Sequence, residues 1–413
     1  MDSNLGSNMI LHPKKGMWLA MFVCFILGIG SLLTWNSMLT IVDYYAYLFP
    51  EYHPTRILVL VFQPFSLLFV SILAYNEARI NTRLRNLVGY TIFFLSSLAV
   101  IILDVASGGK GGIVPFLSLC VLSAAFGVGD ALVQAGMVGD LSLMCPQLVQ
   151  WFLVGSAASG VITSALRMVT KASFNSTNGL RKGALLFFGI TCFLEFVCLI
   201  LYATILPHLP IIKDYRSQAA SEGSKTVYSD LSVAGLHHDQ VSKNSPERLT
   251  NNQLLSKNKD YAVGIIVVGM ISLSIFPGFI SENTGKHSLG SWYAVVLIGV
   301  YNLWNLLGRC TPRIKYLKIE SRKWLMVAIW SRSIFIPAFY IAEHHGGQTL
   351  MIILTSLLGL SNGHFTVRIL TEAPKGYKAP EKNALGNMLI VFFLWGMFIG
   401  AMLNWLWLIG KGW

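Results

Sequence analysis

The decisive stretch lies near the start of the chain, where residues 16–40 read GMWLAMFVCFILGIGSLLTWNSMLT without one charged side chain. A bilayer core about 30 Å thick is crossed by roughly 20 apolar residues in a helix. Lys14 and Lys15 precede the run, as in a secretory signal, but the run is too long for one and no A-x-A-like cleavage site follows it. The stretch therefore predicts a membrane span that stays in the protein.

The remainder of the chain has the same character. Of its 413 residues, 54% are hydrophobic and only 12% are charged, and the mean hydropathy is +0.59. Soluble domains carry about 25% charged residues, so an ordinary soluble protein is excluded and a lipid bilayer is the expected surrounding. The net charge of +12 is typical of cytoplasmic loops in a membrane protein, and no nucleic acid partner is expected.

The apolar runs are helical in length, and only helices or closed barrels satisfy their backbone groups in lipid. We therefore predict an all-α polytopic membrane protein with eleven transmembrane helices. The predicted spans are residues 17–40, 56–75, 86–104, 113–139, 147–170, 183–206, 261–280, 290–308, 324–342, 348–369 and 384–410.

The distribution of Lys and Arg predicts the orientation. With the N-terminus inside, the inner segments hold 22 of these residues and the outer segments hold seven, and positive charge is retained on the cytoplasmic side. We expect a cytoplasmic N-terminus and an extracellular C-terminus. This topology places Asn175, in the sequon Asn175-Ser176-Thr177, in an outside loop as a glycosylation candidate.

One long polar segment, residues 208–259, contains seven basic and five acidic residues and reads as a disordered cytoplasmic linker. It separates an N-terminal six-helix bundle (1–207) from a C-terminal five-helix bundle (260–413). Such a 6+5 division is typical of a two-bundle transporter.

Motifs for catalysis are absent from the sequence. The segment 108–111 (GGKG) lacks the spacing of a phosphate-binding loop, and the six cysteines form no CxxC pair. We expect no enzyme activity, no cofactor, no metal and no obligate protein partner.

Polar side chains within predicted spans indicate a lined cavity or bonds between helices. Asn36 lies in the first span, and three polar residues that share one helical face, Asn302, Asn305 and Arg309, lie in the eighth. For Arg309, extension to the cytoplasmic surface is an equal alternative.

If protons are coupled, two carboxyl groups within spans, Asp130 and Glu195, are the candidates, because charge is costly there; structural hydrogen bonding is the alternative for each. Asp130 precedes Gln134 by one helical turn. Trp35, Phe276 and Trp395 are candidates for stacking on a flat ring, with core packing as the alternative for each.

Four segments resemble motifs of the equilibrative nucleoside transporters, and particularly the plant members. Residues 27–36 (LGIGSLLTWN) are similar to LGxGxLLPWN, 272–278 (SLSIFPG) to SLxxFP, 301–309 (YNLWNLLGR) to FNxxDxxGR, and 359–363 (GLSNG) to GLSNG. Two departures are Thr34 for the usual Pro and Asn305 for the usual Asp. Unlike Asp, Asn305 is uncharged and cannot form a salt bridge with Arg309.

The resemblance implies a 6+5 fold related to the major facilitator architecture that moves nucleosides by alternating access. The residues that it implies for nucleoside contact are Leu32, Trp35, Leu39, Gln134, Phe276 and Asn302. Asn305 remains able to bond a ribose hydroxyl. Asp130 stands where many relatives have Gly.

We expect a transporter of purine and pyrimidine nucleosides, with facilitated and proton-coupled transport both open. The alternative is a receptor or scaffold that has kept the fold and binds nucleosides without flux. The plasma membrane is the expected location, with the vacuolar membrane as the alternative.

Overall fold

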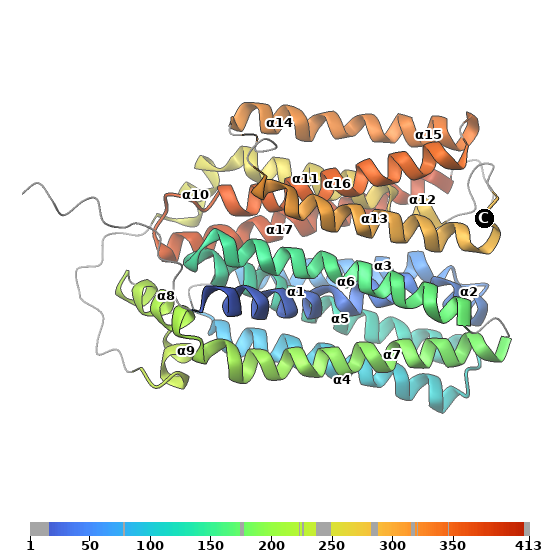
Figure 1. Cartoon of the computed structure of the whole chain (residues 1–413), viewed down its shortest axis with the longest axis horizontal. Coiled ribbons are helices and arrows are strands. Elements are labelled where there is room, and N and C mark those ends of the chain that lie inside the picture. Colours follow the sequence, from blue (N-terminus) through green and yellow to red (C-terminus); the bar gives the residue numbers. More distant parts are fainter. Residues whose placement is uncertain are drawn as a thin grey trace, which may run out of the picture.

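The computed structural model describes residues 16–76, 79–173, 177–222, 224, 227–236, 249–281, 288–314, 319, 321–345 and 347–408. The chain forms long helices that lie side by side along the longest axis of the molecule (Figure 1). The first half contains α1 (Met17–Thr40), α2 (Val42–Leu48), α3 (Pro54–Tyr75), α4 (Thr82–Ser107), α5 (Ile113–Met144), α6 (Pro146–Ser173) and α7 (Thr177–Ile200). The second half contains α11 (Lys259–Ile275), α12 (Gly278–Ser281), α13 (Tyr293–Cys310), α14 (Arg322–Ser331), α15 (Phe335–His345), α16 (Gln348–Glu372) and α17 (Ala379–Asn404).

The all-α membrane architecture is confirmed. Ten helical stretches of the described residues are long and apolar enough to cross a bilayer. Helix α13 is not among these ten, because its 18 residues include Asn302, Asn305 and Arg309. The expected count of eleven spans includes α13 and stays a prediction.

Helices of each half pack mainly on one another. In the first half α1 packs on α6, and α5 packs on α3 and α4; in the second half α11 packs on α17, and α13 packs on α16. The two halves meet where α17 lies against α3 and α5, and where α13 lies against α6. In Figure 1 the helices of the first half, blue to green, lie below the orange and red helices of the second.

Small residues allow the closest of these approaches. A Cβ atom on Gly155 of α6 would lie 1.9 Å from the carbonyl oxygen of Phe25 on α1. A Cβ atom on Gly363 of α16 would lie 2.1 Å from the carbonyl oxygen of Asn305 on α13. Both glycines therefore let two helix backbones touch, which is a recurrent device of helix packing in lipid.

Two of the predicted spans are interrupted. Helix α11 ends at Ile275, Phe276 takes an extended conformation (φ −101°, ψ 137°), and α12 begins after Pro277. The residue before a proline is biased towards extended conformations. Residues Arg332–Ile334 form a 3₁₀ turn between α14 and α15, and Pro337, which has no backbone N–H, follows in the first turn of α15.

The interpretation of 208–259 as a disordered linker is wrong for its described helical parts. Helices α8 (Pro210–Ser221), α9 (Tyr228–Val233) and α10 (Asn251–Lys257) form here. Arg216 of α8 is buried and donates to Asp140 at 2.6 Å, with Asp230 of α9 at 3.3 Å. Burial lowers the pKa of Arg216, but the two carboxylates outweigh it and raise the pKa above its usual value. Charge pairing thus anchors a polar segment that hydropathy alone identifies as a loop.

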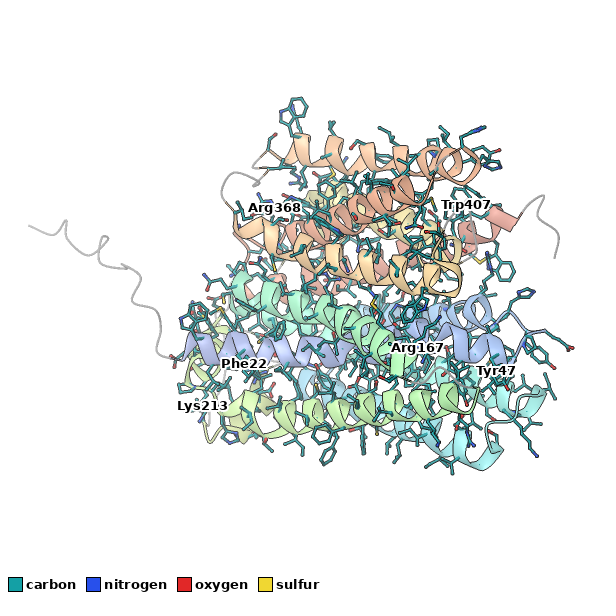
Figure 2. The ribbon with its side chains drawn as sticks, turned by 45° about the vertical axis from the view of Figure 1, so that its right-hand side comes forward. Phe22, Tyr47, Arg167, Lys213, Arg368 and Trp407 are labelled. Carbon is teal, nitrogen blue, oxygen red and sulfur yellow. The ribbon has the colours of Figure 1, made fainter. Side chains whose placement is uncertain are left out.

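The outer surface is apolar, as contact with lipid requires. Trp18, Phe22, Val121 and Trp324 are among many large hydrophobic side chains that are exposed. Figure 2 shows Lys213 of α8 at one end of the molecule and Tyr47 and Trp407 at the other. Helix α1 begins at the end where α8 lies, and the described chain ends at the opposite one (Figure 1).

Candidate functional site

A cavity lies between the two halves of the chain, and the space between its lining atoms, part of it open to solvent, is about 720 Å³. Its lining comes from α1, α3, α5 and α6 on one side and from α11, α13, α16 and α17 on the other. Among the residues that line it are nine singled out from the sequence: Leu32, Trp35, Asn36, Asp130, Gln134, Phe276, Asn302, Asn305 and Arg309.

The other candidates lie elsewhere. Leu39 is buried in the core but is outside the cavity lining, and Trp395 is 43% exposed on α17, edge-on to Phe398. Glu195 is fully buried behind α1, where its Oε2 atom would lie 3.3 Å from a Cβ on Gly30. Asn175 lies outside the described residues.

Two pairs of aromatic rings face the cavity. Trp35 of α1 packs on Phe62 of α3 with 4.1 Å between ring centroids and 42° between planes. Phe276, at the break after α11, stacks on Tyr301 of α13 at 3.9 Å and 13°. The cavity therefore offers flat apolar surfaces from both halves of the chain, which suits a planar heterocycle.

Between these rings, α3 and α5 present a polar face that we call the α3/α5 wall, made of Gln63, Ser66, Asp130 and Gln134. The Ser66 hydroxyl donates to Asp130 Oδ2 at 2.8 Å. The other oxygen, Oδ1, is buried without a hydrogen bond to the described part of the chain, although the Gln134 amide stands close to the carboxylate. The two amide atoms of Gln63 are likewise buried and without a hydrogen bond to the residues described.

Across the cavity, α13 bonds to α6. Asn302 Nδ2 donates to the carbonyl oxygen of Gly160 at 3.1 Å and to the Ser164 hydroxyl at 2.9 Å. Arg309 donates to the carbonyl oxygen of Leu153 and to the Ser156 hydroxyl. In the described part of the chain Arg309 has no ion pair with a carboxylate, so backbone and hydroxyl oxygens carry its bonds.

A chain of hydrogen bonds that we call the relay leads from Arg332, outside the lining, to three residues that line the cavity: Ser272, Asn362 and Asn305. Arg332 donates to the Ser272 hydroxyl at 2.7 Å, Ser272 donates to Asn362 Oδ1 at 2.8 Å, and Asn362 Nδ2 donates to Asn305 Oδ1 at 3.1 Å. Arg332 is 2% exposed. Since Asn305 Oδ1 is an acceptor in this relay, its amide nitrogen is left to donate into the cavity.

Sequence reasoning missed several lining residues. Gln63, Phe62, Ser272, Tyr301 and Asn362 line the cavity but were not singled out. Gln63 was detectable, because a glutamine within an apolar span meets the same criterion that selected Gln134. Tyr301 and Asn362 lie within the quoted 301–309 and 359–363 segments, but their positions there do not show which face of the helix they occupy.

Contacts between the halves lie beyond the cavity at both ends. Towards the end where α8 lies, Arg85 of α4 donates to Asn387 Oδ1 of α17 at 2.9 Å, and Glu222 accepts from the backbone N–H of Ala379 at 2.9 Å. Towards the other end, Arg56 of α3 donates to Asn404 Oδ1 at 3.1 Å. The cavity is thus placed between two sets of contacts that join the halves.

Known proteins resemble this chain over nearly its whole length. A sequence profile described as "Nucleoside transporter" matches residues 117–409. The chain is 57% identical to Equilibrative nucleotide transporter 3 of Arabidopsis thaliana over 407 residues, which are 97% of this chain and 97% of that protein. The chain belongs to the nucleoside transporter family. The transporter is also 31% identical to Equilibrative nucleotide transporter 1 of the same plant, over 99% of this chain and 92% of that protein.

Solved structures place the fold of the transporter among the major facilitators. A proton:xylose symporter of that superfamily has a TM-score of 0.64 at 10% identity, covering 95% of this chain and 89% of its own. The human organic anion transporter MFSD10 has a TM-score of 0.56 at 13% identity, covering 95% and 94%. At this identity the likeness concerns the fold alone.

Proposed function

We propose that this transporter moves purine and pyrimidine nucleosides across the membrane by alternating access, and that it is not an enzyme. The observation that carries the proposal is the central cavity between the halves, with aromatic rings on both sides and polar groups between them. Family membership supports a small uncharged heterocyclic substrate of this kind.

The lining residues divide the recognition of a nucleoside between them. The pairs Trp35–Phe62 and Phe276–Tyr301 hold the base by apolar contact. Gln134 bonds a base edge, since its amide both donates and accepts. The amide nitrogen of Asn302 donates to α6. Its oxygen is therefore left to accept from a ribose hydroxyl.

The charges at the cavity favour nucleosides over nucleotides. A phosphate group is bound best by several donors with positive charge. One guanidinium, Arg309, lines the cavity, and two of its bonds already go to α6, while the Asp130 carboxylate lies in the same cavity. A phosphate would therefore meet an acidic group and a single guanidinium.

The contacts at the two ends support alternating access. We propose that the bonds of Arg85 with Asn387 and of Glu222 with Ala379 part when the cavity opens to the cytoplasm, and that the bond of Arg56 with Asn404 parts when it opens outwards. The 1–207 and 260–413 bundles then rock about the bound nucleoside.

Facilitated and proton-coupled transport remain alternatives. If protons are coupled, Asp130 is the proposed carrier, because it lines the cavity while Glu195 does not. The plasma membrane, a cytoplasmic N-terminus and an extracellular C-terminus stay part of the proposal, with the vacuolar membrane as the alternative location. The charge distribution of the loops supports this orientation.

The test is uptake of labelled adenosine and uridine into proteoliposomes, with and without an inward proton gradient. We expect saturable uptake, reduced about tenfold or more in Gln134→Ala, which removes a base contact. Gln348→Ala, whose side chain bonds Ser288 outside the cavity, is the matched control and should transport normally. Nucleoside binding without any uptake would refute the transporter proposal in favour of a receptor.

The effect of an inward proton gradient on the rate of uptake distinguishes facilitated from proton-coupled transport. If uptake rises with an inward proton gradient, Asp130→Asn should abolish that rise while leaving downhill exchange of uridine. A rise that persists in Asp130→Asn would exclude Asp130 as the proton carrier.

A further inference from the structure

We propose that Gln63 and Asp130 form an amino-selective subsite, which selects nucleosides whose base carries an exocyclic amino group beside an unprotonated ring nitrogen, as in adenosine and cytidine. The proposal rests on the proposed transport of nucleosides and assigns a substrate class within it. It is argued from the placement of the two side chains, from their hydrogen bonds within the protein, and from the donor and acceptor groups that remain without a partner.

The two side chains belong to one face of neighbouring helices. Gln63 precedes Ser66 on α3 by three residues, so both lie on the same side of the helix, one turn apart. Ser66 bonds Asp130 of α5 directly at 2.8 Å. Gln63 and Asp130 line the same cavity, and the Ser66 bond brings their helices together there.

The bonding of the two side chains is incomplete within the protein. Asp130 is 2% exposed and Gln63 is 0% exposed. Both amide atoms of Gln63 have no hydrogen bond to the described residues, and neither has Asp130 Oδ1, although the Gln134 amide stands close to the carboxylate. Buried polar groups without partners are costly and rare. A polar residue kept at such a cost in a cavity is explained by a ligand that bonds it.

A neighbouring residue shows what a structural role would look like. Ser123 of α5 is also buried between α3 and α5, and its hydroxyl donates to the carbonyl oxygen of Leu58 at 2.9 Å. This is the usual use of a polar side chain between helices in lipid. Gln63 makes no such bond, which distinguishes it from a residue that only joins two helices.

The open groups define the complementary base. A carboxylate only accepts hydrogen bonds, and a carboxamide donates through its nitrogen. Asp130 beside Gln63 therefore matches an amino group beside a ring nitrogen that accepts, the pattern of N6 and N1 in adenine and of N4 and N3 in cytosine. Inosine and uridine present a carbonyl oxygen and an N–H there. The amide of Gln63 can turn so that its oxygen accepts from that N–H, but the carbonyl oxygen of the base would still face the carboxylate oxygen of Asp130, so the pair with Asp130 would fail.

The experiment compares initial rates of uptake for adenosine against inosine and for cytidine against uridine in proteoliposomes. We expect the wild-type protein to prefer the amino-bearing member of each pair about tenfold or more, because a polar site rejects an analogue that leaves its groups unpaired. In Asp130→Asn, Ser66 still donates to the side-chain oxygen, and the amide nitrogen now faces the base. The preference should therefore fall to parity or reverse, with inosine and uridine uptake retained or raised.

Two further variants test the second residue of the subsite and provide a control. Gln63→Leu should lower uptake of adenosine and cytidine about tenfold without improving inosine or uridine. Ser123→Ala removes a bond between the same two helices away from the cavity and should leave both ratios unchanged.

Each outcome bears on one proposal only. Equal wild-type uptake of all four nucleosides, or an amino preference that survives in Asp130→Asn, would overturn the subsite and leave nucleoside transport standing. Failure of the folded wild-type protein to take up any nucleoside would instead overturn the proposed function.

Discussion

The two sides of the central cavity differ in how far the protein itself satisfies their polar groups. Behind α13 and α16, the relay links Arg332, Ser272, Asn362 and Asn305 through three hydrogen bonds. On the α3/α5 wall, Gln63 makes none within the described chain and Asp130 is bonded through one of its two oxygens. One side is organised before any substrate arrives, whereas the other depends on a partner from outside the protein.

The two sides therefore contribute differently to the stability of the fold and to the recognition of substrate. Groups bonded within the protein stabilise the fold and hold Asn305 in one orientation, so cutting the relay should cost stability. Groups without partners cost stability and are useful only when a substrate bonds them. Substitutions on the two sides should therefore change the free energy of unfolding in opposite directions.

Arg332→Leu should cause the largest loss. It removes donors from the Ser272 hydroxyl, the Ser361 hydroxyl and the carbonyl oxygen of Val268. The buried Ser272 hydroxyl then loses the bond that it accepts, while the Val268 oxygen still accepts from Ser272. We expect the free energy of unfolding to fall by about 3 kcal/mol, measured by denaturant unfolding in detergent micelles. Arg332→Lys, which retains a positive donor, should lose less. An unchanged unfolding midpoint in Arg332→Leu would show that the relay does not stabilise the fold.

Asn362→Asp should act on substrate binding. Its carboxylate can still accept from Ser272 but cannot donate to Asn305, so Asn305 loses the bond that orients its amide. We expect the KM of nucleoside uptake to rise about tenfold, corresponding to roughly 1.4 kcal/mol, with little change in kcat. Asn362→Gln, which retains both a donor and an acceptor, should be affected less. Equal KM values in wild type and Asn362→Asp would show that the hydrogen bond from Asn362 does not orient Asn305 for substrate binding.

Gln63→Leu should not destabilise the protein. The leucine removes two amide atoms that have no partner in the described chain, so the free energy of unfolding without nucleoside should stay the same or rise by up to about 1 kcal/mol. Stabilisation by added adenosine should be weaker than in wild type, as measured by the shift of the unfolding temperature with ligand concentration. A loss of stability comparable to that of Arg332→Leu would remove the distinction between the two sides.

Asn305→Asp should have the smallest effect on stability. Asn362 can donate to a carboxylate oxygen as it does to the amide oxygen, so the relay is preserved. We expect unfolding within about 0.5 kcal/mol of wild type, while KM in the same uptake assay rises about tenfold as in Asn362→Asp, because the carboxylate has no N–H to donate into the cavity. A complete loss of uptake would show that the donor on Asn305 is indispensable.

Much of the fold could be predicted from the sequence because lipid imposes strong rules on it. The first predicted span, residues 17–40, has the same bounds as α1, since an uncharged run of that length has few other structures. Helix α8 could not be predicted in this way. Its buried residue Arg216 depends on Asp140 and Asp230, which are distant in sequence and become partners only in the folded chain.

The candidate site shows the same limit. Residues quoted from motifs, such as Trp35 and Asn302, lie together at the cavity. Trp395 does not, because an apolar helix gives no sequence signal for which of its faces meets the cavity and which meets lipid. Gln63 was missed although its polarity was visible, since its importance comes from the missing hydrogen bonds, which only coordinates reveal.

The most direct measurement is a cryo-electron microscopy structure of the transporter in lipid nanodiscs with adenosine. The account predicts the adenine ring between the Trp35–Phe62 and Phe276–Tyr301 pairs, with its amino group within hydrogen-bonding distance of Asp130 Oδ1. Adenosine outside this cavity would contradict the proposed site, and a base edge directed at α13 rather than at the α3/α5 wall would contradict the assignment of the two sides.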